Sequence, residues 1–298
     1  MICDICRILD ENNISYKRDI CLKPYNSFRI DSKAKLGIFP TSAKELSLAV
    51  SALEEYGERY EICGKCSNIL FGDGELDLTL IFTEKMSKIS CESDTITAEA
   101  GATLSSLATK AAELSLTGFE FAKGIPGTVG GALFMNAGAY GGQMSDITVS
   151  SVALDRKSSE IIEITEHGFG YRKSIYIERP ELVCLGGVFK LCRGNADEIN
   201  EKMRNFAEQR REKQPLNFPS AGSYFKRPEG NFAGKLIEEA GLKGKTVNGA
   251  CVSEKHAGFI VNLGSARACD ILELEKIVKS EVLRRFGVML EREVRYIR

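Results

Sequence analysis

The stretch that decides the fold is Gly124-Ile-Pro-Gly-Thr-Val-Gly-Gly131, which continues as Ala132-Leu-Phe-Met-Asn-Ala-Gly-Ala-Tyr-Gly-Gly142. Glycine reaches positive φ angles and lets a ligand come close to the main chain. Successive free N–H groups in such a loop form an anion-binding nest, which suits a pyrophosphate without a lysine. A shorter loop of the same kind is Cys63-Gly-Lys-Cys-Ser-Asn68. Two such loops favour an anionic cofactor over two ordinary tight turns.

Neither loop belongs to a familiar nucleotide motif. Neither matches GxxxxGK[ST], which argues against a P-loop nucleotidase, and neither fits GxGxxG with an acid about 20 residues later. The formal net charge of −1 gives no global electrostatic footprint for nucleic acid. No run of 18 apolar residues and no secretory signal is present, so we expect a soluble, cytoplasmic protein with no membrane insertion.

Hydrophobic periodicity predicts a mixed order of helices and strands. Ser42 and Glu45 form a capping box before an apolar stripe, which predicts a helix at 43–56. A second stripe predicts a helix at 104–114. The mixed order favours an α+β fold over a doubly wound sheet. The remaining predicted helices lie at 195–213, 236–240 and 268–285, and the predicted strands at 25–30, 78–82, 95–100, 147–154, 161–164, 182–191, 259–261 and 288–297.

Ten cysteines and two histidines limit the metal chemistry. Two CxxC pairs, Cys3–Cys6 and Cys63–Cys66, formally supply four thiolates for zinc, but their separation far exceeds that of a compact zinc knuckle. The two histidines, His167 and His256, exclude a His-rich site. We therefore predict reduced thiols and no metal. A non-enzymatic, zinc-dependent interaction protein is an alternative hypothesis.

Seven ordered motifs give the chain a resemblance to the UDP-N-acetylenolpyruvoylglucosamine reductase family, the flavoenzymes of bacterial cell-wall precursor synthesis. The resemblance runs from about residue 22 to the C-terminus and indicates the short subclass, which lacks a substrate-capping insertion. The motifs are Asn26-Ser-Phe-Arg-Ile30, Gly64-Lys-Cys-Ser-Asn68, Glu120-Phe-Ala-Lys-Gly-Ile-Pro-Gly-Thr-Val-Gly-Gly131, Met135-Asn-Ala-Gly-Ala-Tyr-Gly141, Tyr171-Arg-Lys-Ser174, Ser220-Ala-Gly-Ser-Tyr-Phe-Lys226 and Glu291-Arg-Glu-Val-Arg295.

The resemblance implies both a fold and a reaction. It implies a two-lobed FAD-binding domain of the vanillyl-alcohol-oxidase or p-cresol-methylhydroxylase type and a C-terminal α+β substrate-binding domain. The implied reaction is NADPH-dependent reduction of UDP-N-acetylglucosamine enolpyruvate to UDP-N-acetylmuramate through FAD, which serves peptidoglycan synthesis and through it cell shape, the cell cycle and division. We expect a monomer. The implied ranges are a lead-in at 1–20, FAD-binding lobes at 21–85 and 86–194, and a substrate-binding domain at 195–298.

The resemblance also assigns the cofactor-binding residues. The family's first loop usually has a second glycine where Cys66 stands here. A cysteine there is strained by about 1 kcal/mol if the position needs a positive φ; otherwise the site accepts a small side chain. The residues implied for the FAD pyrophosphate are Gly64, Lys65, Cys66, Ser67 and Asn68, and those implied along the flavin and beyond it are Gly124, Ile125, Pro126, Gly127, Thr128, Gly130, Gly131, Asn136 and Gly138.

Three side chains are implied for catalysis: Arg172, Ser223 and Glu293. Arg172 offers a rigid fork for a carboxylate. Ser223 lies in a loop of small residues, where a hydroxyl can approach a substrate as proton donor. In the predicted final strand, alternation places Glu291 and Glu293 on one face, so spacing alone does not choose between them. The family's Glu-x-Glu-Val-Arg ending selects Glu293.

Two cations are candidates for the uridine diphosphate. Lys213 is similar to a substrate-binding lysine of the family, and Arg227 is an alternative anion contact. A second enzyme hypothesis is another FAD-dependent oxidoreductase of the same fold that acts on a different alcohol or sugar. In that wider group FAD is often tethered through His or Cys, whereas His167 and His256 lie outside the glycine loops.

Overall fold

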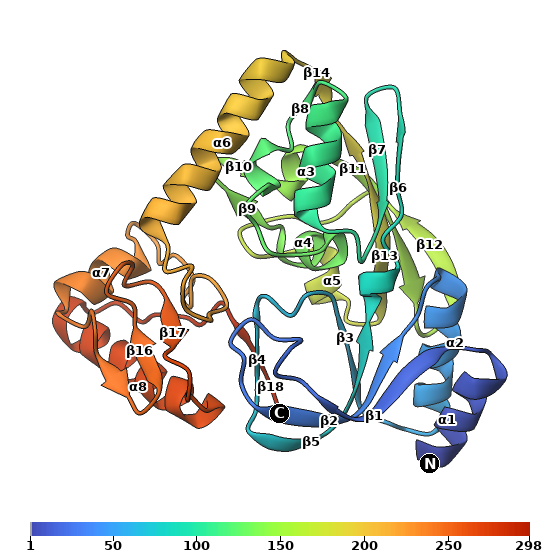
Figure 1. The fold of residues 1–298 in the computed structure, drawn as a ribbon, viewed down its shortest axis with the longest axis horizontal. Coiled ribbons are helices and arrows are strands. Elements are labelled where there is room, and N and C mark those ends of the chain that lie inside the picture. The colour runs from blue at the N-terminus through green and yellow to red at the C-terminus, as the bar shows by residue number, and fades with distance from the viewer. Residues whose placement is uncertain (1) are drawn as a thin grey trace. The chain divides into compact units, whose positions relative to one another are not determined.

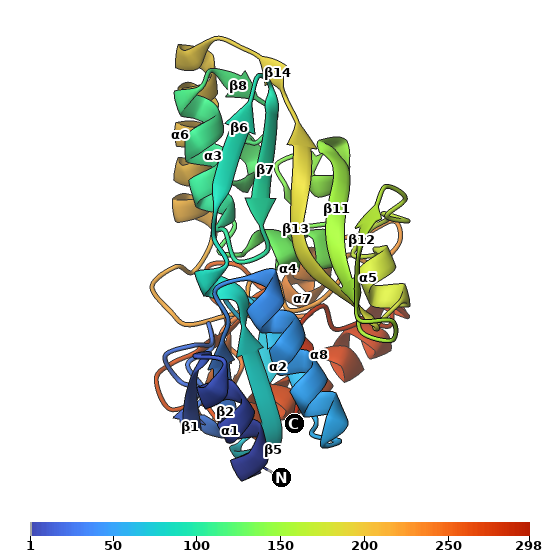
Figure 2. The same ribbon diagram turned by 90° about the vertical axis from the view of Figure 1, so that its right-hand side faces the viewer.

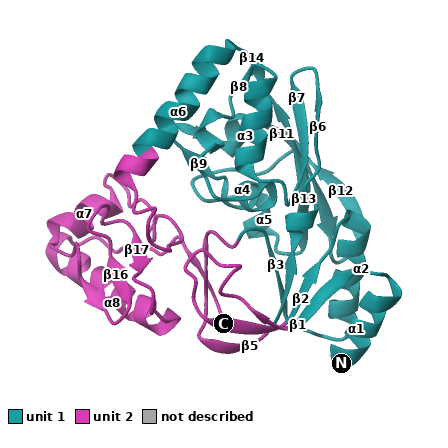
Figure 3. Cartoon of the chain, viewed as in Figure 1, with its two compact units in different colours: residues 1–18, 36–65, 78–209 teal, residues 19–35, 66–77, 210–298 magenta. Residues whose placement is uncertain are grey.

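The structure, a computed structural model, describes residues 2–298 and divides them into two compact units (Figure 3). Each unit is assembled from three separate stretches of chain, so the units do not coincide with the four ranges expected from the sequence. The predicted division into FAD-binding lobes therefore stays a prediction. Unit 1 comprises the residues up to 18, 36–65 and 78–209. Unit 2 comprises residues 19–35, 66–77 and 210–298.

An antiparallel sheet of five strands forms the largest part of unit 1 (Figure 2). The strand order is β12-β11-β13-β7-β6. In the register, Ser151 of β11 faces Gly187 of β13, and Phe189 of β13 faces Ile96 of β7. The strands are β6 (Ile89–Glu92), β7 (Thr95–Glu99), β11 (Thr148–Asp155), β12 (Glu160–Ile164) and β13 (Leu182–Lys190).

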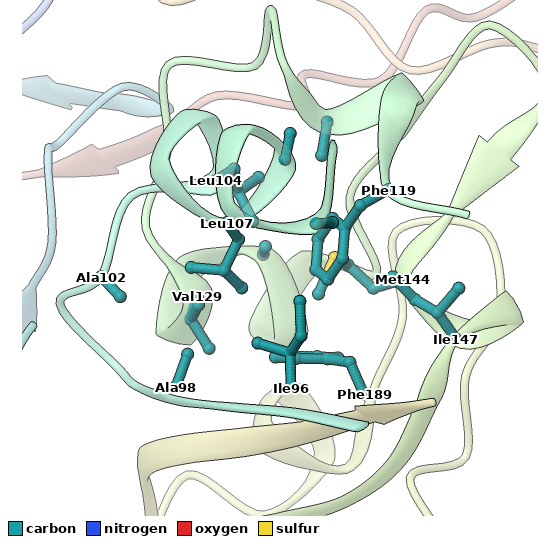
Figure 4. Packing of buried hydrophobic residues seen from close by; sticks show 14 of the residues in the cluster. Ile96, Ala98, Ala102, Leu104, Leu107, Phe119, Val129, Met144, Ile147 and Phe189 are labelled. Atoms are coloured by element: carbon teal, nitrogen blue, oxygen red, sulfur yellow. The ribbon is translucent and has the colours of Figure 1, made fainter. Parts of the chain in front are cut away.

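Two helices of unit 1 bury their apolar faces against this sheet. They are α3 (Leu104–Glu113) and α4 (Val129–Met135). Figure 4 shows Leu107 of α3 and Val129 of α4 beside Ile96 and Phe189 of the sheet. All four side chains are fully buried. Because apolar burial is the main favourable term in folding, this core fixes the loop that precedes α4.

A second core of unit 1 surrounds its N-terminal helices. Helix α1 (Ile2–Glu11) and helix α2 (Ala43–Glu55) contribute Ile5 and Leu46, both fully buried. Strand β3 (Tyr60–Cys63) pairs parallel with β5 (Gly74–Phe82). The unit boundary falls inside β1 (Ser15–Cys21), β2 (Ser32–Phe39) and β5, which form a sheet with β3 in the order β1-β2-β5-β3.

Shorter elements complete unit 1. Helix α5 (Ile175–Glu178) follows the predicted Arg172 segment, and the long helix α6 (Ala196–Lys213) continues past the end of the unit (Figure 1). No helix within residues 2–298 has the length and apolar character needed to cross a bilayer. The short strand pairs are β8 (Leu116–Thr117) with β14 (Cys192–Arg193) and β9 (Gly138–Ala139) with β10 (Gly142–Gln143).

Unit 2 packs two helices around small sheets. Helices α7 (Ala233–Glu239) and α8 (Ala268–Phe286) share a core with Phe28, Leu70 and Tyr224. Strands β15 (Thr246–Val247), β16 (Ala250–Val252) and β17 (Ile260–Asn262) form an antiparallel sheet. Strand β4 (Ile69–Phe71) pairs parallel with β18 (Arg295–Ile297). The predicted α+β class is confirmed.

The predicted start of the helix at 43–56 is confirmed in part. Ser42 Oγ accepts the Glu45 N–H at 3.2 Å, as a capping box requires. The Glu45 carboxylate, however, accepts the N–H of Thr41 at 2.7 Å instead of that of Ser42. At the other end of the chain, the predicted stop of α8 at Gly287 is confirmed, because this glycine has a φ of 68°.

The predicted strand at 25–30 is wrong. The side-chain amide of buried Asn26 donates to the carbonyls of Leu22 at 2.8 Å and Ile30 at 3.2 Å. Its oxygen accepts the Ile30 N–H at 3.0 Å, and Arg29 takes a φ of 55°. One side chain therefore satisfies the main chain of a turn. The aromatic and β-branched composition reflects burial of Phe28 and Ile30, not strand pairing.

The predicted final strand at 288–297 is much shorter, since only Arg295–Ile297 is strand. The alternation that placed Glu291 and Glu293 on one strand face does not apply, because neither residue lies in β18. The segment before β18 makes an isolated bridge instead, between Arg292 and Phe225. Glu293 is therefore positioned by pairing with the Ser223 loop and not by a sheet.

Candidate active site

Gly64 and Thr128 bring the two predicted loops into contact in unit 1. A Cβ at Gly64 would overlap Thr128 Oγ1 and lie 3.1 Å from Thr128 Cβ. Thr128 is itself buried and forms an isolated bridge with Thr103. The hydroxyl of Thr83 donates to the Cys63 carbonyl at 3.3 Å and fixes the residue before the first loop. Only glycine fits at position 64, and its main chain lies directly against the second loop.

Packing explains one of two neighbouring glycines in α4. The Gly130 N–H donates to the Ala100 carbonyl at 2.9 Å, and an added Cβ would lie 3.1 Å from Ala100 Cβ. At Gly131 the one heavy atom within 4 Å of an added Cβ is Thr128 Oγ1, at 3.7 Å. Close packing against Ala100 thus favours glycine at 130, whereas an added Cβ at Gly131 would make only an ordinary contact.

The sequence prediction missed Gly101. A Cβ there would overlap the Thr83 carbonyl and lie 2.8 Å from the Met86 carbonyl. The Gly101 N–H donates to the same Met86 carbonyl at 2.8 Å. The available signal was its position between the predicted strand at 95–100 and the predicted helix at 104–114. A glycine in such a short connection indicates a close approach of the main chain to a neighbouring segment. Gly101 therefore lets its main chain pack directly against the segment from Thr83 to Met86.

The end of the first loop lies in unit 2 and carries the residue that departs from the family pattern. Cys66 is buried and has a φ of 47°, so the position does adopt the left-handed region. The expected strain of about 1 kcal/mol or more therefore applies there. The Asn68 side-chain amide donates to the Glu293 carbonyl at 3.3 Å, and the main-chain carbonyl of Asn68 accepts the Arg295 N–H at 3.0 Å. The loop end is thus held against the segment that carries Glu293.

Arg172 lies in a tight turn of unit 1. Gly170 and Lys173 exchange two main-chain hydrogen bonds of 3.2 Å, and Arg172 has a φ of 54°. A non-glycine residue in this region costs about 1–3 kcal/mol and persists only where its surroundings hold it. The Asn136 amide donates to the Gly170 carbonyl at 3.1 Å, and the Ser174 hydroxyl donates to a carbonyl of α4 at 2.7 Å. Helix α4 therefore positions the Arg172 turn.

Structural roles account for Asn136 and Gly138. Asn136 ends α4 in the left-handed conformation, with a φ of 42°, and its side-chain oxygen accepts the Ser145 N–H at 2.9 Å. A Cβ at Gly138 would lie 2.7 Å from the Gly142 carbonyl oxygen across the β9–β10 hairpin. The part of both residues in cofactor binding stays a prediction.

Ser223 and Glu293 are brought together in unit 2. Tyr224, the residue after Ser223, donates its N–H to the Gly258 carbonyl at 2.8 Å. The Tyr224 carbonyl accepts the Glu293 N–H at 2.9 Å. Ser223 is exposed and Glu293 is half-buried, whereas Tyr224 is fully buried. A main-chain hydrogen bond therefore joins the two segments that carry the candidate side chains.

The two candidate anion contacts are exposed cations of unit 2. Lys213 is the last residue of α6, and the Lys255 ammonium donates to the carbonyl of Arg211 in the same turn at 2.6 Å. The guanidinium carbon of Arg227 lies 4.6 Å from the centre of the Phe232 ring, a cation–π contact. The part of Lys213 and Arg227 in substrate binding stays a prediction.

The cysteines and histidines have contacts of their own. The Arg18 guanidinium donates to Cys6 Sγ at 3.4 Å and to Cys3 Sγ at 3.5 Å. His167 Nε2 lies 2.8 Å from Ser151 Oγ, and burial lowers the pKa of this histidine. All ten cysteines are free thiols. Within residues 2–298 no group of three or more His, Cys, Asp or Glu side chains is arranged to hold a metal ion.

Comparisons with known proteins place both regions in one family. The model of the UDP-N-acetylenolpyruvoylglucosamine reductase C-terminal domain matches residues 214–297, and the FAD binding domain model matches residues 34–165. The reductase of Clostridioides difficile is 46% identical over 297 residues, 99% of this chain and 96% of the relative. That of Caldicellulosiruptor bescii is 43% identical over 292 residues, 97% of this chain and 93% of the relative.

A solved structure agrees with these relatives. The crystal structure of UDP-N-acetylenolpyruvylglucosamine reductase from Thermus caldophilus is similar with a TM-score of 0.81 and 31% sequence identity. The similarity covers 96% of this chain and 100% of that chain. The predicted combination of an FAD-binding region with this family's C-terminal domain is therefore confirmed.

Proposed function

Because the chain belongs to the UDP-N-acetylenolpyruvoylglucosamine reductase family, we propose that it reduces UDP-N-acetylglucosamine enolpyruvate to UDP-N-acetylmuramate with electrons from NADPH. The relatives that carry this name match the chain over more than nine tenths of its length. The product is a precursor of peptidoglycan, so the reaction serves cell-wall synthesis, cell shape and division. The observation that carries the proposal is the contact of Gly64 with Thr128, which joins two glycine loops in the FAD-binding region.

The residues of these loops fit FAD. Gly64 admits no side chain, whereas an added Cβ at Gly131 would meet Thr128 Oγ1 at 3.7 Å, an ordinary contact. A ligand can therefore approach the main chain, where N–H groups suit a pyrophosphate. We assign residues 64–68 to the pyrophosphate and residues 124–131 to the flavin, with Asn136 and Gly138 beyond them. FAD, when bound, supplies hydride transfer between NADPH and the enolpyruvyl group.

Arg172 binds the carboxylate of the enolpyruvyl group in this proposal. Hydride delivery to the alkene places enolate-like negative charge on that carboxylate, and a guanidinium fork pairs with it through two hydrogen bonds. The strained φ of 54° at Arg172 supports this role, because strain of this kind is retained where the surroundings hold a residue for a task. The hydrogen bonds from Asn136 and Ser174 hold the turn in place.

Ser223 donates the proton that completes the reduction, and Glu293 assists it. A serine hydroxyl is a poor acid in water, so a neighbouring group must help it donate. The hydrogen bond between the Glu293 N–H and the Tyr224 carbonyl keeps the two side chains on adjoining segments. Lys213 and Arg227 serve the negatively charged diphosphate of the sugar nucleotide. We further propose that the enzyme acts as a monomer in the cytoplasm, where NADPH and nucleotide sugars are made.

A spectroscopic experiment tests the proposal. The purified protein should carry the visible absorption of oxidised flavin. NADPH should bleach this absorption without oxygen, and the enolpyruvyl sugar nucleotide should restore it. A colourless preparation that takes up no FAD would contradict the proposal. Yellow colour that stays with the acid-precipitated protein, without reoxidation by the sugar nucleotide, would favour a different oxidoreductase with covalently bound FAD.

A further inference from the structure

The buried carboxylate of Glu275, on α8, accepts hydrogen bonds from two segments. One segment carries Ser223 and the other carries Glu293. The Tyr224 hydroxyl donates to Glu275 Oε2 at 2.8 Å, and the Arg292 guanidinium donates to the same oxygen at 3.3 Å. Tyr224 directly follows Ser223, and Arg292 directly precedes Glu293. We propose that Glu275 is a positioning residue that sets the distance between Ser223 and Glu293, an inference that rests on the proposed function.

Tyr224 is fixed at three points. Its N–H donates to the Gly258 carbonyl at 2.8 Å, its carbonyl accepts the Glu293 N–H at 2.9 Å, and its hydroxyl ends on Glu275. The side chain is fully buried while that of Ser223, one residue earlier, is exposed. A buried anchor beside an exposed reacting group leaves the hydroxyl of Ser223 little freedom to shift with the loop.

Arg292 gives the second segment the same anchor. Its guanidinium reaches Glu275, and its main chain makes the isolated bridge with Phe225. Glu275 Oε2 therefore accepts a hydrogen bond from a side chain of each segment, while main-chain hydrogen bonds join the two segments to each other. If the carboxylate is lost, the bridge remains but the two anchoring side chains lose their common acceptor.

Two cations lie against the Glu275 carboxylate. The Glu275 residue is 6% exposed, and Oε1 accepts from the Lys279 ammonium at 2.7 Å, so two cations and one phenol face the buried anion. Removing one partner from a buried charge pair leaves the others uncompensated. A neutral amide at this position keeps an acceptor but not the charge that holds Arg292. The anchor therefore depends on charge as well as on shape.

A half-reaction experiment on the FAD-loaded enzyme separates positioning from stability. In Glu275→Gln, bleaching by NADPH should stay within twofold of the wild-type rate, because the anchored segments act on the sugar nucleotide. Reoxidation by saturating enolpyruvyl sugar nucleotide should slow by about 10- to 100-fold, the range expected when a reacting group moves by about 1 Å. The concentration for half-maximal reoxidation should change less than the saturating rate.

A matched control lies on the same helix. Glu281 pairs with Arg284 and Arg285 in an ion-pair cluster of α8, so Glu281→Gln should leave both half-reactions unchanged. Tyr224→Phe removes one hydroxyl from the anchor and should slow reoxidation in the same direction by a smaller factor. This variant decides the question if Glu275→Gln does not yield a folded, FAD-loaded protein.

Three outcomes would overturn the inference. The first is wild-type reoxidation in Glu275→Gln, or in Tyr224→Phe where the first variant does not fold. The second is equal slowing of both half-reactions, which would indicate a general effect on the fold. The third is a wild-type enzyme whose flavin is reduced by NADPH but not reoxidised by the sugar nucleotide. In that case the proposed function fails, and this inference fails with it.

Discussion

The two candidate regions of the molecule are built by opposite means. The loops of unit 1 depend on the absence of side chains, because Gly64 and Gly130 lie where an added Cβ would meet Thr128 or Ala100. The Ser223 region of unit 2 depends on buried side chains, since Tyr224 and Arg292 both end on Glu275. We therefore expect an added side-chain atom to disturb the glycine loops of unit 1. In the Ser223 region of unit 2, we expect the loss of a charge or a hydroxyl to have that effect.

The largest expected effect falls on the side-chain region. Ser223→Ala should slow reoxidation by the enolpyruvyl sugar nucleotide by about 10²- to 10⁴-fold, the usual contribution of a general acid. Bleaching by NADPH should continue at a rate close to that of the wild type. Anaerobic stopped-flow spectroscopy measures both steps. Equal loss in the two half-reactions would exclude Ser223 as proton donor.

An added methyl group tests the loop region. Gly64→Ala should weaken FAD retention by about 10- to 100-fold, since overpacking costs about 1–3 kcal/mol. Gly170→Ala is the matched control, because its added Cβ would meet only ordinary contacts of 3.5 and 3.7 Å with Lys173. FAD titration followed by flavin fluorescence compares the two variants. Unchanged affinity in Gly64→Ala would show that the loop can move away from Thr128.

Arg172 is the exception that sharpens the comparison, since the proposed function places a reacting side chain on this strained turn of unit 1. Arg172→Lys keeps the positive charge but loses the fork, so one charge-assisted hydrogen bond is lost. That loss costs about 1.5–3 kcal/mol, or roughly 10- to 100-fold in reoxidation. Reoxidation at several substrate concentrations measures it. A variant as fast as the wild type would mean that the carboxylate is held elsewhere.

The smallest effect concerns pH, and each unit holds one histidine, His167 buried in unit 1 and His256 half-buried in unit 2. Burial lowers the pKa of His167 and of His256, so the folded protein binds fewer protons than the unfolded chain below pH 6.5. Stability from these groups is therefore present above the ordinary histidine pKa and falls as the pH drops through it. Tm values between pH 7.5 and 5.5 should decline less steeply in His167→Gln than in the wild type. An identical slope would contradict the prediction.

Local signals predicted much of the fold. The Ser42 cap and the glycine at 287 located the helices α2 and α8 because capping depends on a few adjacent residues. The predicted strand at 25–30 failed because one buried Asn26 side chain replaced strand pairing. The final strand was overextended because residues 291–293 pair with the Ser223 loop, a pairing that the sequence does not indicate.

The sequence predicted the parts of the candidate site that are formed by glycine loops. It did not predict the part that depends on contacts between buried side chains. Gly64 and Gly130 stood in motifs, whereas Glu275 was one of many charged residues. A signal existed, because Glu275 continues the helical spacing of Ile271, Val278 and Val282, all fully buried. A carboxylate on an apolar stripe indicates a buried partner, but the partners Tyr224 and Arg292 are distant in sequence. Only the fold brings them together.

The hydrogen bond between Asn68 and Glu293 joins residues 225 positions apart. At a translation rate of about 5–20 residues per second, the ribosome needs roughly 10–45 s to make the chain between them. During that interval the nascent polypeptide exposes β4 and the end of the first loop without the neighbour that will hold them. Unit 2 is therefore the part of the molecule in which a chaperone, or a premature stop, should have its greatest influence on the yield of native enzyme.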